Sequence, residues 1–314
     1  MRRLRDENIR RLKNAAWRSL KLGKKLRRAA FKHLPVALRR GETLYRRMAT
    51  TLGASKPTIA KDVVVTLTSF PLRIGKLHHV ISSLLDQSVQ PRKVVLYLAL
   101  DEFPGRSIPK SLARLQGDRF EVRFVSENLR PHNKLQYALT DFPETWIATS
   151  DDDRLYPVNW LARLLKTAAE TPETIICARG RRMAVAHGRF LPYRDWPLYD
   201  SPLRSFLLFP EGSWGILYPP GSLDPAIGDR ELIRKLALLN DDVWFKAMSL
   251  MQNVPCSASG QSQPISRIHF KPNVRLWDLN QHGQLTDEAF NNVFGHFGLT
   301  ADTVLAMEAS LRGN

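Results

Sequence analysis

The stretch TWIATSDDDRLYP, residues 145–157, joins a short apolar run to three consecutive carboxylates. Asp151, Asp152 and Asp153 all ionise near neutral pH, and adjacent like charges raise the free energy unless water or a cation neutralises them. The apolar run before them predicts a strand, so the triplet stands at the carboxyl end of that strand. We therefore expect a cation to lie against these side chains.

Strands and helices alternate on the N-terminal side of the triplet. Short β-branched or apolar runs predict strands over residues 62–70, 92–99, 119–126 and 145–150, and helical spacing of apolar residues predicts helices over 73–87, 108–116 and 133–142. This order predicts an α/β fold with a mostly parallel sheet and helices on both faces. Ligands bind such sheets at the carboxyl ends of the strands, which is where the triplet lies.

The second half of the chain alternates less cleanly. Residues 173–180 predict a further strand, residues 191–225 are rich in proline and aromatic residues, and residues 229–251 predict a helix. The two cysteines, Cys177 and Cys256, indicate no disulfide framework and fit a reducing compartment.

Positive charge is concentrated at the N-terminus. Of a net charge of +17 over 314 residues, residues 1–60 hold 18 Lys and Arg against three acids, a net +15, and the remaining 254 residues hold 29 against 27. The globular part is nearly neutral and lacks the usual DNA-reading motifs, so we expect no nucleic-acid partner.

The sequence predicts a basic amphipathic helical arm over residues 1–55 and a globular domain over residues 56–314. Basic residues on one face, with Trp17 and Phe31 available for the interface, favour a helix lying on an anionic membrane surface. A solvated arm and a helix docked on a partner protein remain alternatives. Since neither a long apolar span nor a signal-peptide pattern is present, we expect a cytoplasmic protein, peripheral on the inner face of the cytoplasmic membrane if the arm binds lipid.

Five short segments, in this order, resemble a known family: TSFPLR, RPHNKLQYAL, SDDDRLYP, GSWGILYPPG and NDDVWF. The chain resembles GT-A fold glycosyltransferases of the bacterial polysaccharide- and lipopolysaccharide-building type over about residues 62–290, and its triplet matches their DxD motif. The resemblance implies a metal-dependent, inverting enzyme. Such an enzyme moves a sugar from a UDP- or GDP-sugar donor to a glycan or glycolipid acceptor in surface polysaccharide biosynthesis.

The resemblance also implies which residues meet the cation. Mn²⁺ or Mg²⁺ prefers oxygen ligands and would stabilise the negative charge of the departing diphosphate. Asp153 is the expected main ligand, Asp151 is a further ligand that also lies toward the donor's ribose, and His269 is a candidate to complete the metal shell. Asp152 either contacts the donor, turns to solvent or caps the next helix.

Further roles concern the two substrates. On the donor side the resemblance assigns the nucleoside to Thr66, Ser69 and Arg73, the base to Asp101, and the diphosphate to Lys134 at a helix start. On the acceptor side it assigns the general base to Asp242 with Asp241 as its neighbour, and an acceptor loop to Trp214, Gly215 and Tyr218. Asp241 and Asp242 are also typical of the capped start of a helix, and the pair can serve both as a helix start and as the catalytic acids.

Two other functions remain open. A sugar nucleotidyltransferase also uses an α/β sheet and metal-binding acids, although residues 68–76, TSFPLRIGK, lack the glycines expected of its loop. A non-enzymatic module tethered to a membrane or to nucleic acid is supported by the basic arm alone.

Overall fold

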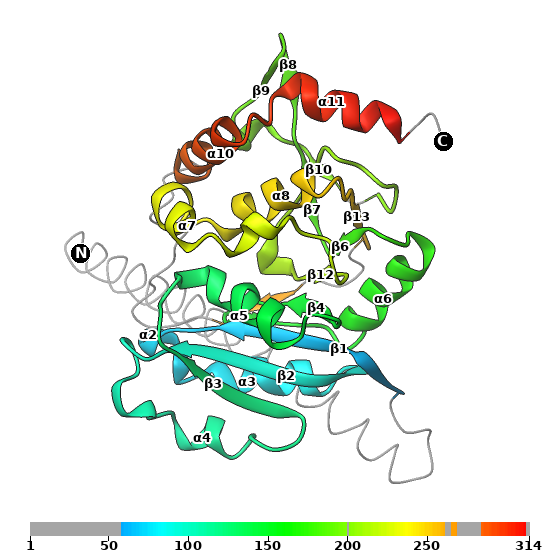
Figure 1. Cartoon of the computed structure of the whole chain (residues 1–314). Helices are drawn as coiled ribbons and strands as arrows, with labels where there is room; N and C mark the ends of the chain where they lie inside the picture. The colour runs from blue at the N-terminus through cyan, green and yellow to red at the C-terminus, as the bar shows by residue number, and fades with distance from the viewer. Residues whose placement is uncertain (1–57, 200, 261–264, 269–283, 312–314) are drawn as a thin grey trace, which may run out of the picture. The chain divides into compact units, whose positions relative to one another are not determined.

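The computed structural model describes residues 58–199, 201–260, 265–268 and 284–311 (Figure 1). The predicted arm over residues 1–55 and the candidate ligand His269 lie outside these residues. The arm, its boundary with the domain and the role of His269 therefore remain predictions.

A seven-stranded sheet forms the centre of the domain, in the order β13-β6-β12-β4-β1-β2-β3. Strand β1 pairs in parallel with β2 and with β4, and β2 pairs in parallel with β3. Within this sheet as described, β12 alone runs antiparallel to its neighbours β4 and β6. The mostly parallel α/β sheet is therefore confirmed. Its strands are β1 (Thr58–Thr68), β2 (Val89–Ala99), β3 (Phe120–Val125), β4 (Trp146–Thr149), β6 (Ile175–Cys177), β12 (Ile216–Tyr218) and β13 (Cys256–Ala258).

Helices cover both sides of this sheet. Helix α5 (Asn133–Asp141) packs on β1, β2 and β4, while α3 (Leu77–Leu85) packs on β2 from the opposite side, as Figure 1 shows. Helix α6 (Trp160–Glu170) packs against β2 and β6. The shorter helical segments of this half are α2 (Pro71–Ile74), η1 (Pro104–Arg106), α4 (Lys110–Ala113) and η2 (Arg130–His132).

The first strand begins four residues earlier than the sequence predicts. Residues 63–67, in its second half, are almost completely buried, and their continuous run of β-branched and apolar residues marks them in the sequence. The earlier residues 58–60 pair with the start of β2 across a register irregularity and are mostly exposed. Because they contribute little to the core, no hydrophobic pattern predicts them.

The predicted helix over residues 229–251 is in fact two helices, α7 (Arg230–Leu236) and α8 (Asp241–Met251). Asn240 starts the second helix because its side-chain oxygen accepts the amide N–H of Val243 at 3.3 Å. The break at residues 237–240 lies beside α5, where the ring Nε2 of His132 contacts the carbonyl of Ala237 at 2.8 Å. Helix α8 thus begins with Asp241 and Asp242 in its first turn.

Smaller sheets, short helical segments and the C-terminal helices complete the domain. A three-stranded sheet has the order β10-β7-β11, and β14 pairs with β5, and β8 with β9. Their bounds are β5 (Arg154–Leu155), β7 (Gly180–Arg182), β8 (Val185–Ala186), β9 (Arg189–Phe190), η3 (Tyr193–Asp195), β10 (Leu198–Tyr199), β11 (Leu208–Pro210), η4 (Gly212–Trp214), η5 (Pro225–Gly228), β14 (Ser266–Arg267), α10 (Gln284–His296) and α11 (Ala301–Ser310).

Two further findings concern the state of the cysteines and the length and apolar character of the helices. Cys177 and Cys256 are buried and free, as predicted. Across the described residues, no helix combines the length and the apolar character that spanning a membrane requires.

Candidate active site

A pocket of about 920 Å³ lies where β1 and β4 end and where α5 and α8 begin. Its size suits a ligand such as a nucleotide sugar. Many of the predicted site residues line it: Ser69, Arg73, Lys134, Asp151, Asp152, Asp153, Trp214, Asp241 and Asp242.

The parallel pairing of β1 and β4 brings two loops together at one edge of the sheet. Ser69 follows β1 and donates its hydroxyl to Oδ2 of Asp152 at 2.7 Å, and Arg73 donates to Oδ1 at 2.6 Å. Burial and the charge of Asp153 raise the pKa of Asp152 from 3.8 to about 6, although Arg73 opposes the shift. Asp152 therefore holds the two loops together, and it does not turn to solvent.

Asp153, the expected metal ligand, faces three guanidinium groups. Its Oδ2 accepts hydrogen bonds from Arg267 at 2.8 Å, while Nε of Arg154 lies 3.5 Å from Oδ1 and Arg73 lies 3.6 Å from Oδ2. The antiparallel pairing of β14 with β5 sets Arg267 directly opposite Arg154. One buried carboxylate thus stands among several positive charges.

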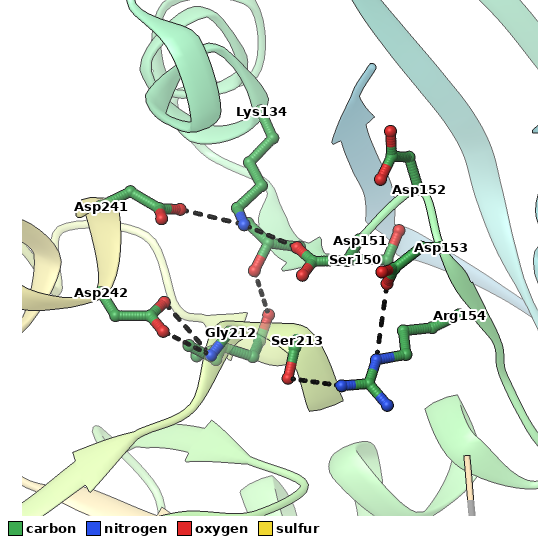
Figure 2. A network of polar contacts seen from close by, with 12 residues as sticks. Lys134, Ser150, Asp151, Asp152, Asp153, Arg154, Gly212, Ser213, Asp241 and Asp242 are labelled. Atoms are coloured by element: carbon green, nitrogen blue, oxygen red, sulfur yellow. Dashed lines mark hydrogen bonds and ion pairs between the residues drawn. The ribbon is translucent and has the colours of Figure 1, made fainter. Parts of the chain in front are cut away.

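Lys134 connects the triplet to the acidic pair (Figure 2). Its Nζ lies 2.9 Å from Oδ1 of Asp151 and 2.9 Å from Oδ2 of Asp241, and its side chain is only 5% exposed. Burial lowers the pKa of Lys134, but Asp151, Asp241 and Asp242 more than offset this and hold that pKa well above its ordinary value. Lys134 is therefore a fixed positive charge in the pocket, and it is not an ordinary exposed lysine.

Asp242 is held by the backbone of η4. The amide N–H of Gly212 lies 3.1 Å from each carboxylate oxygen of Asp242, as the paired dashed lines in Figure 2 show. Burial and the neighbouring charge of Asp241 raise the pKa of Asp242 well above its ordinary value, against the opposing effects of Lys134 and Gly212. Since Asn240 supplies the helix cap, the carboxylate of Asp242 does not serve as the cap.

A Cβ on Gly212 would lie 2.3 Å from Oδ1 of Asp242, so this close approach requires glycine. The sequence shows the Gly-rich stretch around residue 212, but it does not show that this stretch contacts Asp242 on α8.

The ring of Trp214 contacts two arginines. The Cζ atom of Arg179 is 4.3 Å from its ring centre and that of Arg154 is 5.4 Å away. These contacts occupy the ring on which a sugar was expected to stack.

Several predicted site residues lie elsewhere in the fold. Thr66 is completely buried within β1, and Tyr218 is buried in β12, where it packs edge-on against Phe245. Asp101 is exposed and accepts hydrogen bonds from Asn128 at 3.1 and 3.2 Å. None of these three predicted residues lines the pocket.

Gly215 is the fourth predicted residue that does not line the pocket. It has φ +93° and packs so closely on Trp160 that a Cβ would lie 2.4 Å from the ring. Its requirement for glycine is therefore conformational and steric.

The donor set of the triplet fits a hard divalent cation in its chemistry. Asp151 and Asp153 offer carboxylate oxygens to one pocket, and Mg²⁺ needs only one or two such ligands besides phosphate and water. No cluster of three or more His, Cys, Asp or Glu suited to a metal occurs in the part of the chain that the structure describes. A cation at Asp153 would exchange places with Arg267, which now pairs with that carboxylate.

Comparison with solved structures gives matches at low identity. A mannosyltransferase, PcManGT from Pyrobaculum calidifontis in complex with GDP-Man and Mn²⁺, is 19% identical, with 48% of this chain and 46% of that chain covered and a TM-score of 0.31. TarS 1–349 from S. aureus is 13% identical, with 76% and 72% covered and a TM-score of 0.43. A UDP-glucose pyrophosphorylase from Acinetobacter baumanii is 10% identical, with 76% and 98% covered and a TM-score of 0.41.

This chain thus spans less than half of the mannosyltransferase. Because the three TM-scores are below 0.5, these likenesses carry no argument about function. No curated protein matches the chain in sequence.

The sequence also matches a family model. Residues 73–222, just under half of the chain, match the model of glycosyl transferase family 2. The matched segment runs from Arg73 through the end of β4 and the triplet to η4, and it includes the start of α5 but not that of α8. The predicted glycosyltransferase is therefore confirmed, and the non-enzymatic module is set aside. The protein is a glycosyltransferase of the GT-A fold, and its residues 73–222 are similar to glycosyl transferase family 2.

Proposed function

We propose that the protein is an inverting glycosyltransferase that moves a sugar from a UDP- or GDP-sugar to a hydroxyl group of a glycan or glycolipid in surface polysaccharide biosynthesis. The observation that carries the proposal is the joint position of Lys134, Asp151 and Asp242 in one pocket. A fixed positive charge and a carboxylate with a raised pKa are the two groups that such a transfer needs.

The donor half of the pocket supports binding of a nucleoside diphosphate. Lys134 lies in the first turn of α5, where the positive end of the helix dipole adds to the charge of its ammonium group. In the proposed complex its Nζ faces the diphosphate oxygens and stabilises the charge that develops as the sugar departs. Ser69 and Arg73 position the triplet through Asp152.

The acceptor half supports a general base. Asp242 in its carboxylate form would accept the proton of the attacking hydroxyl as the bond to the sugar carbon forms. Its raised pKa favours this, because a carboxylate with a higher pKa is a stronger base. The N–H of Gly212 fixes the carboxylate so that it does not need to be oriented at each turnover.

A divalent cation completes the proposal. Asp153 and Asp151 would hold Mn²⁺ or Mg²⁺, which when bound supplies positive charge to the departing diphosphate. His269 is the proposed third protein ligand of this cation.

The function is tested by incubating the full chain with a panel of UDP- and GDP-sugars, with Mn²⁺, with Mg²⁺ or with a chelator. Binding is measured by protection against thermal unfolding, and release of the nucleoside diphosphate reports turnover. We expect one nucleotide sugar to protect and to be consumed. A parallel incubation with sugar 1-phosphate and a nucleoside triphosphate tests the nucleotidyltransferase alternative, and pyrophosphate release there with no nucleotide-sugar turnover would refute the proposal.

We also propose that residues 1–55 attach the enzyme to an anionic membrane surface. The net charge of +15 over residues 1–60 supports this, since each basic residue near such a surface adds about 1 kcal/mol. Full-length protein should sediment with vesicles rich in phosphatidylglycerol at low salt, and a chain lacking residues 1–55 should not. Failure of the full-length protein to sediment at low salt would favour a protein partner for the arm.

A further inference from the structure

One wall of the pocket, beside Asp242, is rich in guanidinium groups. We call Arg154, Arg179 and Arg181 the basic wall. Arg179 and Arg181 lie on either side of Gly180 at the start of β7, Arg154 begins β5, and all three line the same pocket as Asp242. None of these arginines was assigned a role from the sequence.

Glu211 balances only part of this charge. Its Oε2 accepts a hydrogen bond from Nε of Arg179 at 2.6 Å, and its Oε1 accepts from Nε of Arg181 at 3.2 Å and from the hydroxyl of Tyr193 at 3.1 Å. Two guanidinium groups therefore share one carboxylate, which leaves one positive charge in excess. An anion bound there would pair with this remaining charge.

Arg154 adds a further positive charge. It donates a hydrogen bond to the neutral hydroxyl of Ser213 at 3.4 Å, and the carboxylate nearest to it, Asp153, is already paired with Arg267 at 2.7 Å. Arg154 and Arg179 also lie over the ring of Trp214. Arg154 is thus held by a ring and a hydroxyl, neither of which carries charge, and it shares Asp153 with Arg267.

The wall also has hydrogen-bond donors to spare. Arg179 uses Nε on Glu211, and neither of its terminal nitrogens has a hydrogen-bond partner among the described residues. Arg181 uses Nε on Glu211 and one terminal nitrogen on the carbonyl of Trp196 at 2.8 Å. The side chains are 30% and 23% exposed, so their remaining N–H groups are accessible from the pocket.

The wall adjoins the proposed general base. Glu211, which holds both arginines, directly precedes Gly212, whose N–H binds Asp242. A group bound by Arg179 and Arg181 therefore lies on the side of the pocket where Asp242 is held. It lies next to the hydroxyl that Asp242 would deprotonate.

We propose that the acceptor carries an acidic group, a phosphate or a carboxylate, which Arg179 and Arg181 bind while the neighbouring hydroxyl group faces Asp242. Guanidinium groups match both anions because they present paired N–H donors in a plane. This inference rests on the proposed function, since it names the chemical class of that enzyme's acceptor.

The test uses glucose 6-phosphate, glucuronate and glucose as probes, titrated against the full chain with and without saturating UDP or GDP. Nucleotide in the pocket prevents the phosphate probe from binding at Lys134. Arg179→Gln and Arg181→Gln are compared with Arg194→Gln, which removes an arginine that is 72% exposed and outside the pocket. The affinity for UDP and GDP is measured separately for each protein. Loss of nucleotide binding would count against the proposed function, whereas the acidic probes test the inference about the acceptor.

We expect at least one acidic probe to bind about 10-fold or more tightly than glucose, and this preference to be lost in Arg179→Gln and Arg181→Gln but kept in Arg194→Gln. Preference for the phosphate or for the carboxylate identifies the acidic group. Equal binding of glucose and both acidic probes, or unchanged binding in the two wall variants, would overturn the inference. If these variants misfold, Glu211→Gln decides the matter, because it frees both guanidinium groups and should keep or strengthen acidic-probe binding, whereas weaker binding would contradict the proposal.

Discussion

Replacing Gly212 with alanine tests whether the position of Asp242 matters for turnover. The new Cβ would lie 2.3 Å from Oδ1 and 3.3 Å from Cγ of Asp242, so the side chain must move. An ordinary contact between these atoms needs more than 3 Å, and the carboxylate is therefore displaced by about 1 Å. A displacement of that size in a reacting group lowers the rate by about 10²-fold.

The same substitution should change the pH dependence of turnover. The N–H of Gly212 lowers the pKa of Asp242, whereas burial and Asp241 raise it. When the carboxylate moves away from this N–H, its pKa rises further, so the acidic limb of the rate profile should move to higher pH. A merely structural role for Gly212 would leave that limb in place.

The assay compares Gly212→Ala with Gly117→Ala, in which the added Cβ would have no neighbour within 4 Å. Release of the nucleoside diphosphate gives turnover, donor protection against unfolding gives affinity, and the unfolding temperature reports the fold. We expect lower turnover with unchanged donor affinity in the first variant alone. Full turnover in Gly212→Ala, with an unchanged acidic limb, would refute the reasoning.

Three further predictions concern the acidic residues. Asp153→Asn should abolish the stimulation of donor binding by Mn²⁺ or Mg²⁺ while the protein stays folded, and near-normal stimulation in a donor titration would remove Asp153 from the metal site. In the folded protein the pKa of Asp152 is raised from 3.8 to about 6. Its stabilising contribution to the free energy of unfolding is therefore present below pH 4 and is lost as the pH rises to 6, an effect of at most about 3 kcal/mol. Urea unfolding at several pH values should show this loss in the wild type but not in Asp152→Asn, and parallel curves would contradict it. Asp241→Asn removes a charge that raises the pKa of Asp242, so the acidic limb of the pH profile of turnover should move to lower pH. An acidic limb that stays in place or moves to higher pH would show that Asp241 does not raise the pKa of Asp242.

The sheet could be predicted because its physical causes are local. The buried β-branched run of residues 63–67 and the apolar helix faces between strands predict parallel pairing, and that pairing brings Ser69 to Asp152. The start of α8 was equally visible, since Asn240 and two acids form a favourable first turn. These elements position the triplet and the acidic pair Asp241 and Asp242.

The contacts between distant segments of the pocket could not be predicted in the same way. Arg267 and Asp153 are 114 residues apart, and no periodicity connects them. Arg179 and Arg181 look like ordinary surface residues until β7 pairs with β11 and brings them to Glu211. Tyr218 was expected in a loop, but residues 216–218 form β12, and pairing on both sides buries the ring.

The central claim, that Asp242 is the general base of a glycosyl transfer, is tested most directly by measuring donor affinity and turnover side by side in Asp242→Asn and the wild type. A base acts on the acceptor hydroxyl and not on the donor, so we expect donor affinity to stay nearly unchanged while turnover falls by about 10²- to 10⁴-fold. Turnover close to that of the wild type, or loss of donor binding together with turnover, would contradict the account.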